Sequence, residues 1–181
     1  ISCMSSLLSF SMYAHCSDRI LEALSLHCTK LQSLVITSSK DITDVSVEPI
    51  RNFRNLQCLS LLYTSIKTEG FHQLFARENN QPHPFNLQTL ELSFMKSCHL
   101  NLANLVNIWP NLSRIYLDNV QDDLSSLAVL QKLTEIKLCA CNFISHNVSG
   151  LLEERGRYLT SLELISVKAV DILMVCQTCP K

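Results

Sequence analysis

The sequence predicts an α/β fold, a right-handed solenoid or horseshoe of about seven irregular coils, with parallel strands on the concave face and helices on the convex face. Two observations lead to this prediction. A leucine step of three residues and then two, L-x-x-L-x-L, recurs along the 181 residues, and the segments between the steps carry helix-like apolar spacing. A strand and a returning helix, repeated, place parallel strands beside one another with helices behind them.

The repeated step defines the coils. Its clear copies begin at Leu31, Leu56, Leu87, Leu112, Leu133 and Leu159, and a weaker copy consists of Leu7, Phe10 and Met12. Successive starts are 24, 25, 31, 25, 21 and 26 residues apart, close to the period of leucine-rich repeats. We therefore expect one repeat array over residues 1–181, as a fragment of a longer protein.

Side chains alternate between the two faces of a strand, so the second and third apolar residues of each step point the same way. In "LQSLVI", Leu34 and Ile36 face the core, and Ser33, Val35 and Thr37 face outward. The other inward pairs are Leu59 and Leu61, Leu90 and Leu92, Ile115 and Leu117, Ile136 and Leu138, and Leu162 and Leu164. Each coil supplies these side chains to one continuous core, because no coil is stable alone.

The segments between the strands predict helices. In "DRILEALSLHC" one apolar stripe contains Ile20, Leu21, Leu24 and Cys28, and Asp18 is placed to cap the helix start or to stabilise it by its charge. Less regular stripes contain Ile66, Phe71, Leu74 and Phe75; Leu102, Leu105, Val106 and Trp109; and Val148, Leu151 and Leu152. We expect the single tryptophan to pack at a helix end. The 31-residue interval contains an insertion, "ARENNQPHPF", which predicts a projecting loop.

Composition and charge argue against several classes of function. Apolar residues make up 47% and charged residues 17%, and the formal net charge is −1, which gives no basic footprint for nucleic acid or an anionic membrane. No apolar run approaches the roughly 18–20 residues of a transmembrane helix, and the first residues lack the pattern of a signal peptide. We expect a cytoplasmic or nuclear protein.

The nine cysteines, an odd number, favour reduced thiols over a disulfide framework. Two glycosylation sequons, at Asn111 and Asn147, keep a secreted protein open as the alternative. The close cysteine pairs lack the second ligand pair that a zinc site needs, so we interpret them as structural. These pairs are Cys139 with Cys141 on a strand and its turn, and Cys176 with Cys179 at an expected buried helix end.

The residue types that could support catalysis are dispersed along the sequence. None of the six histidines forms a nucleophile-like motif with Cys or Ser, and the three glycines leave no phosphate-binding loop. The sequence therefore predicts no catalytic residue, no metal site, no cofactor and no enzymatic activity.

At these residues the chain resembles the leucine-rich repeat superfamily over nearly its whole length. Within it, "CTKL" at 28–31, "WPNL" at 109–112 and "CQTCPK" at 176–181 resemble the cysteine-containing subclass found in many F-box proteins. The Asn or Cys that this pattern carries eight residues after the first leucine is replaced here by Ser39, Thr64, Met95, Val120 and Val167, and only Cys141 matches. We therefore expect the side-chain ladder along the turn to be mostly lost.

The resemblance implies a scaffold for protein–protein interaction, with the target held on the concave face. It most resembles the substrate-recognition repeats of an F-box-type adaptor, in which an N-terminal F-box missing from this segment would dock ubiquitin-ligase subunits. The alternatives are a ribonuclease-inhibitor-like or immune-sensor scaffold, and a GTPase-activating repeat regulator that supplies an arginine such as Arg114 in trans.

Neighbouring strands present three outward columns of side chains, about 4.8 Å apart from strand to strand. They are Val35, Ser60, Glu91, Tyr116, Lys137 and Glu163; Ser33, Cys58, Thr89, Arg114, Glu135 and Ser161; and Thr37, Leu62, Ser93, Asp118, Cys139 and Ile165. This register predicts that Arg114 faces Glu135 and that Lys137 faces Glu163. A partner or a neighbouring loop is expected to cover the apolar residues of the third column.

Two interpretations of this face stay open. One is a recognition strip centred on Tyr116 and Arg114, because aromatic and arginine side chains dominate interface energetics. The other is a solvated face whose charges neutralise one another. On the first, the candidate partner-binding residues are Arg114, Tyr116, Glu91, Glu135, Lys137, Glu163, Leu62 and Ile165.

Overall fold

The computed structural model describes residues 4–76, 83, 85–141, 146–167, 170 and 172–179. The chain divides into two compact units, Ile1–Met95 and Lys96–Lys181. We call them unit 1 and unit 2 and describe each by itself.

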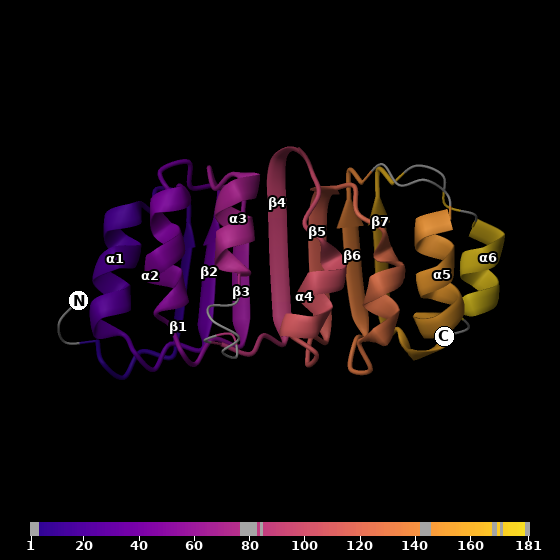
Figure 1. Ribbon diagram of the computed structural model, residues 1–181, viewed down its shortest axis with the longest axis horizontal. Helices are drawn as coiled ribbons and strands as arrows, with labels where there is room; N and C mark the ends of the chain where they lie inside the picture. Colours follow the sequence, from indigo (N-terminus) through magenta and orange to yellow (C-terminus); the bar gives the residue numbers. More distant parts are fainter. Residues whose placement is uncertain are drawn as a thin grey trace. The chain divides into compact units, whose positions relative to one another are not determined.

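In both units strands alternate with helical segments (Figure 1). Unit 1 contains β1 (Ser9–Tyr13), α1 (Asp18–His27), β2 (Ser33–Thr37), the 3₁₀ segment η1 (Asp44–Ser46), α2 (Val47–Arg51), β3 (Cys58–Leu62), α3 (Thr68–Leu74) and most of β4 (Thr89–Cys98). Unit 2 contains α4 (Leu102–Ile108), β5 (Arg114–Val120), η2 (Leu124–Val129), β6 (Glu135–Cys139), α5 (His146–Arg155), η3 (Gly156–Tyr158), β7 (Ser161–Ile165) and α6 (Ile172–Thr178).

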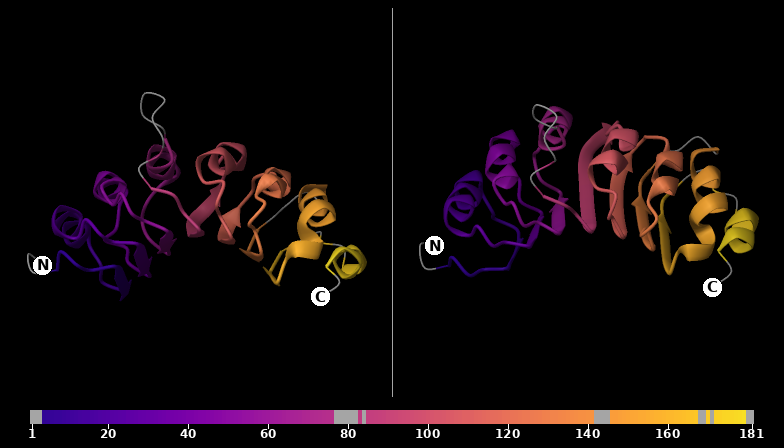
Figure 2. Two further views of the ribbon diagram at one scale, coloured as in Figure 1. Left: turned by 90° about the horizontal axis from the view of Figure 1, so that it is seen from below. Right: turned by 60° about the horizontal axis from the view of Figure 1, so that its bottom comes forward.

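The strands of each unit are parallel and pair in chain order. In unit 1, β1 pairs with β2, β2 with β3, and β3 with β4; in unit 2, β5 pairs with β6 and β6 with β7. Within each unit the helices cover one face of the sheet and leave the other without a helical layer, as Figure 2 shows. This arrangement confirms the predicted α/β solenoid of strand-and-helix coils. We call the uncovered side the strand face.

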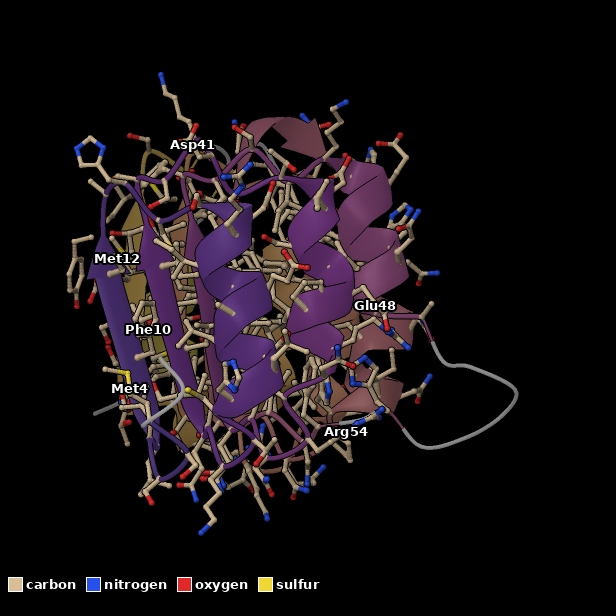
Figure 3. All side chains as sticks on the ribbon, turned by 90° about the vertical axis from the view of Figure 1, so that its left-hand side faces the viewer. Met4, Phe10, Met12, Asp41, Glu48 and Arg54 are labelled. Atoms are coloured by element: carbon tan, nitrogen blue, oxygen red, sulfur yellow. The ribbon has the colours of Figure 1, made fainter. Side chains whose placement is uncertain are left out.

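The predicted inward residues form the core. The pairs on β2, β3, β4, β5 and β6 are at most 2% exposed. Phe10 and Met12 on β1, and Leu162 and Leu164 on β7, are only half-buried. Each of these two strands has a single neighbour within its unit, so one flank of its anchors lacks packing partners. Figure 3 shows Phe10 and Met12 on the outermost strand of unit 1.

Most strands end at a residue in the left-handed backbone region. Seven residues after the first leucine of the coil, φ is positive at Ala14, Ser38, Tyr63, Asn119, Ala140 and Ser166, with values from 48° to 76°. At this position the N–H of Ala14, Ser38 and Ala140 donates to a carbonyl of the next strand at 2.8–2.9 Å. The turn thus extends the sheet ladder by one bond.

β4 is the exception to this pattern. It continues as a strand to Cys98, and the Tyr63 N–H donates to the Ser93 hydroxyl at 2.5 Å instead of to a carbonyl. The prediction that Met95 occupies a turn position is therefore wrong, because the β4 backbone runs straight through it.

The expectation that the turn ladder is mostly lost is only partly right. The buried Ser39 hydroxyl accepts from the Cys16 N–H at 3.1 Å and donates to the Thr37 carbonyl at 3.1 Å. The Cys141 thiol donates to the carbonyls of Leu117 and Cys139. A serine hydroxyl and a thiol therefore take over the bonding expected of Asn.

Thr64 marks a break in this ladder. It is only 3% exposed, and its hydroxyl has no hydrogen-bond partner among the described residues.

The predicted helical stripes are buried except for Ile20, which is half-buried, and Trp109 is fully buried, as expected for packing. The coil that begins at Leu112, with only 21 residues, uses the 3₁₀ segment η2 in place of an α-helix. A 3₁₀-helix rises about 2.0 Å per residue and an α-helix about 1.5 Å, so a shorter segment covers the same height.

Of the two predicted roles of Asp18, capping is wrong, because Ser17 occupies the N-cap position, whereas Asp18 does lie in the first turn of α1, where its charge favours the helix start. Its carboxylate accepts from the N–H and the hydroxyl of Thr43, at 2.9 and 2.7 Å, and from the Ser46 hydroxyl. Asp44 does the same for the following coil, where its Oδ1 accepts from the Lys67 N–H at 2.8 Å. These carboxylates link neighbouring coils on the helical side.

Two further expectations have mixed outcomes. Cys176 is exposed and Cys179 half-buried, so the expected burial of this pair is wrong. Among the described elements, α6 packs against α5 and η3, and this packing leaves Cys176 exposed. Most of the insertion "ARENNQPHPF" lies outside the described residues, although Phe85 at its end is buried.

Candidate functional site on the strand face

On the strand face of unit 2, charged and aromatic side chains gather in matched positions. The register pairs Arg114 with Glu135, Tyr116 with Lys137, and Lys137 with Glu163, as the sequence predicted. These side chains lie on this face because they alternate with the buried anchors of β5, β6 and β7. The helices that the structure describes in this unit lie on the opposite side of the strands (Figure 2).

Arg114 and Glu135 form a two-pronged ion pair. Arg114 Nε donates to Glu135 Oε2 at 2.6 Å, and its terminal nitrogen donates to Oε1 at 2.8 Å. Hydrogen bonding from the guanidinium holds the pKa of the Glu135 carboxyl below its ordinary value, against a smaller opposing effect of burial. Both side chains are presented to solvent, at 51% and 37% exposure.

Lys137 connects the other two members of the strip. Its ammonium lies 2.8 Å from Glu163 Oε2 and 5.2 Å from the centre of the Tyr116 ring. A cation at this distance from an aromatic face is attracted by the ring quadrupole. Tyr116, Lys137 and Glu163 therefore form one ordered row across three strands.

The third column of unit 2 differs in character. Asp118, Cys139 and Ile165 are aligned by the register. Asp118 is only 7% exposed, whereas Ile165 is 43% exposed. The pKa of the Cys139 thiol is raised, first by burial and then by the charge of Asp118, so the thiol stays protonated at neutral pH.

Asp118 was predicted to lie on the outward column but was not among the candidate site residues. The sequence signal was its spacing of two residues from Tyr116, which places both on one face of β5. The spacing could not reveal that this carboxylate is buried.

The remaining candidates, Glu91 and Leu62, belong to unit 1 and are half-buried. Around them the strand face of unit 1 is poor in charge, and the outward Ser60 and Ser93 are buried, at 0% and 3% exposure. Ser60 is flanked in the register by the larger Val35 and Glu91. The outward columns are therefore not uniformly exposed, and the predicted residues do not form one set.

Other parts of the described chain gather no comparable groups. His, Cys, Asp and Glu side chains in these ranges do not cluster in threes that could hold a metal ion. The cysteines with described side chains carry free thiols. In the part of the chain that the structure covers, no helix has both the length and the apolar character needed to cross a membrane.

A groove on the helical side of unit 1 is bordered by Asp44, Glu48 and Arg51. The buried Arg51 guanidinium is already bonded to the carbonyls of Gln73, Leu74 and Ala76, and Asp44 to Lys67, so these two charged groups have structural tasks.

Searches with the sequence find no matching protein-family model and no significantly similar curated protein. Among solved structures, an internalin, InlF, from Listeria monocytogenes is similar with a TM-score of 0.60 and 24% identity, covering 98% of this chain and 46% of that one. Internalin C2 from the same organism gives a TM-score of 0.59 and 18% identity, over 97% of this chain and 78% of that one.

The chain thus spans about half the length of InlF. A plant peptide hormone receptor, RGFR1 in complex with RGF2, is matched with a TM-score of only 0.43 and 15% identity, over 92% of this chain and 29% of that one, and adds nothing to the assignment. At such identities the likeness to the internalins concerns the fold. Together with the register of the strands, it gives this chain the fold of the leucine-rich repeat proteins.

Proposed function

We propose that this chain is a non-enzymatic protein-binding scaffold that holds its partner on the strand face of unit 2. The observation that carries the proposal is the ordered row of Tyr116, Lys137 and Glu163 beside the Arg114–Glu135 pair. Arginine and aromatic side chains in a pre-arranged, solvent-accessible set suit an interface, because little side-chain entropy is lost when a partner binds.

The same pairs contribute little to folding. An exposed ion pair contributes about 0–1 kcal/mol to the free energy of unfolding. So small a stabilisation of the fold does not explain why these side chains are aligned across three strands. The neutralised solvated face remains the competing interpretation, and it predicts that removing these side chains changes stability slightly and binding not at all.

For the finer role we propose the substrate-recognition repeats of an F-box-type ubiquitin-ligase adaptor, in the cytoplasm or nucleus. Support comes from Cys28 and Cys141, which match cysteine positions of that repeat pattern and are both buried. Of the alternatives, a GTPase-activating arginine fits less well, because Arg114 is held by both oxygens of Glu135.

A crosslinking experiment tests the binding face. In the full-length protein in cells, Tyr116 is replaced by photoreactive benzoylphenylalanine, and Tyr158, an exposed tyrosine of η3, is replaced in a matched control. We expect protein adducts at position 116 that are missing at position 158, identified by mass spectrometry. Each adduct is then tested with purified protein, where Tyr116→Ala and Arg114→Ala should weaken binding at least tenfold.

Two results would contradict the proposals separately. Full binding of every identified partner by both alanine variants would remove the strand face as the site. An upstream reading frame without an F-box, combined with no ligase subunit among the copurified proteins, would remove the adaptor role and leave the scaffold role standing.

A further inference from the structure

The charges on the strand face of unit 2 do not balance. Among the residues whose side chains the structure describes, its outward charged residues are Arg114, Asp118, Glu135, Lys137 and Glu163. Both cations are matched, Arg114 by Glu135 and Lys137 by Glu163. Among the described residues Asp118 has no ion-pair partner, and it is 93% buried, the complement of its 7% exposure.

We propose that Asp118, Cys139 and Ile165 form a subsite for one long cationic side chain, Lys or Arg, of the protein partner. The inference rests on the proposed function and specifies what the partner must present. The charged head would meet Asp118, and the aliphatic stem would cover Cys139 and Ile165.

The geometry fits a side chain with an apolar stem and a charged end. The three residues are direct neighbours on β5, β6 and β7, so the column runs about 10 Å from carboxylate to aliphatic group. Lys and Arg commonly lay their methylene groups along apolar surface while the charge reaches a polar end. Ile165, at 43% exposure, is the apolar surface that such a stem would remove from water.

A buried carboxylate without a cation is unfavourable by itself. Burial removes much of its hydration, and hydrogen bonds or an opposite charge have to replace it. The adjacent Cys139 thiol stays protonated and is hydrogen-bonded to Asp118, but a thiol is only a weak donor. Lys137 on the same strand is engaged by Glu163 and the Tyr116 ring. A partner cation would supply the missing compensation, whereas an anion or an apolar group would not.

The experiment selects ligands without assuming a known partner. A phage library of random 12-residue peptides is selected on the full chain and counter-selected on Tyr116→Ala, so that strand-face binders are kept. We expect the recovered sequences to share a Lys or Arg. Replacing that residue by neutral citrulline, or by acetyl-lysine, in a synthetic peptide should weaken binding at least tenfold.

Two variants that each remove one negative charge separate the subsite from general electrostatics. With Asp118→Asn, the charged and neutral peptides should bind equally; with Glu153→Gln, at an exposed glutamate of α5 outside the strand face, the tenfold difference should persist. Ile165→Ser should weaken both peptides. Thermal melts confirm that each variant folds, and the peptide comparison on the unmodified protein remains decisive if Asp118→Asn does not.

The outcomes distinguish this inference from the proposed function. If selection yields no peptide that depends on Tyr116, both are overturned. If such peptides bind but lack a shared basic residue, or lose nothing on neutralisation, or keep their charge preference on Asp118→Asn, only the cationic subsite is overturned.

Discussion

At the scale of single residues, Arg51 is a buried cation that closes the end of α3. It is 7% exposed, and its guanidinium donates to the carbonyls of Gln73, Leu74 and Ala76 at 2.9–3.1 Å. These carbonyls lie at the C-terminal end of a helix, where backbone acceptors lack intrahelical partners and the dipole favours a cation.

We predict that Arg51→Met lowers the free energy of unfolding by about 2–4 kcal/mol, because buried carbonyls lose a charged donor. Arg54→Met is the control, since Arg54 is exposed a few residues further on, as Figure 3 shows; it should cost less than about 0.5 kcal/mol. Urea denaturation followed by circular dichroism measures both. Equal stability of the two variants would contradict the role given to Arg51.

The pKa of Glu135 is also decided by one neighbour. Because its folded pKa is lowered by the Arg114 hydrogen bond, the pair stabilises the folded chain above the ordinary carboxyl pKa and loses that effect as the pH falls through the folded value. We predict that Arg114→Gln raises the Glu135 pKa towards its ordinary value. Carbon-13 NMR titration of the carboxyl group measures it, and Arg157→Gln, at an exposed arginine of η3, should leave the Glu135 pKa unchanged.

At the scale of elements, the turn after each strand requires a left-handed residue, and this chain uses side-chain-bearing residues there instead of glycine. Ala140, after β6, has φ of 48° and is exposed, so its methyl group strains the backbone without packing in return. Left-handed backbone costs an L-residue about 1–2 kcal/mol, partly offset by the lower entropy of its unfolded state.

We therefore predict that Ala140→Gly stabilises the protein by about 0.5–1 kcal/mol. The matched control is Ala103→Gly, in the exposed part of α4, where loss of helix propensity should destabilise by about 1 kcal/mol. Thermal and urea unfolding should give opposite signs for one and the same substitution. A loss of stability at both positions would contradict the backbone strain assigned to Ala140.

Helix packing between coils depends on a missing side chain at Gly70 of α3. A Cβ there would overlap Asp44 Oδ1 and lie 2.9 Å from Ile66 Cγ2, and it would displace the carboxylate that accepts from Lys67. At Gly150 of α5, the nearest atom to an added Cβ would be 3.8 Å away, at Ser125.

We predict that Gly70→Ala destabilises by about 1–3 kcal/mol through overpacking, whereas Gly150→Ala stabilises by up to about 1 kcal/mol through helix propensity. Differential scanning calorimetry distinguishes the two. If Gly70→Ala were as stable as Gly150→Ala, Asp44 would not be wedged against α3.

At the scale of the whole molecule, the repeat arithmetic predicted the strands because each depends on local periodicity. Leu34 with Ile36 and Ile136 with Leu138 are buried where a period of two residues placed them, and Arg114 meets Glu135 because parallel coils share one register. The buried anchors and the facing charged pair can therefore be identified from the spacing of residues along the chain.

The features that the sequence did not predict have a common cause, because they depend on contacts between neighbouring coils. Asp18 bonds to Thr43, 25 residues away, and Ser93 accepts from Tyr63, 30 residues away. The local spacing of residues does not indicate either of these hydrogen-bond partners. The burial of Ser60 depends on the size of its neighbours on two other strands, which a column drawn from one repeat does not contain.

By itself the sequence determined the fold class, the inward leucines and the pairs that face each other across β5, β6 and β7, because a fixed side-chain period and a fixed repeat leave no other register for the core. Only the tertiary structure decided that, among the described residues of this face, Arg114 and Lys137 are already neutralised while the buried Asp118 carboxylate has no ion-pair partner. Burial and charge compensation are properties of neighbouring coils acting together, and no single coil encodes them.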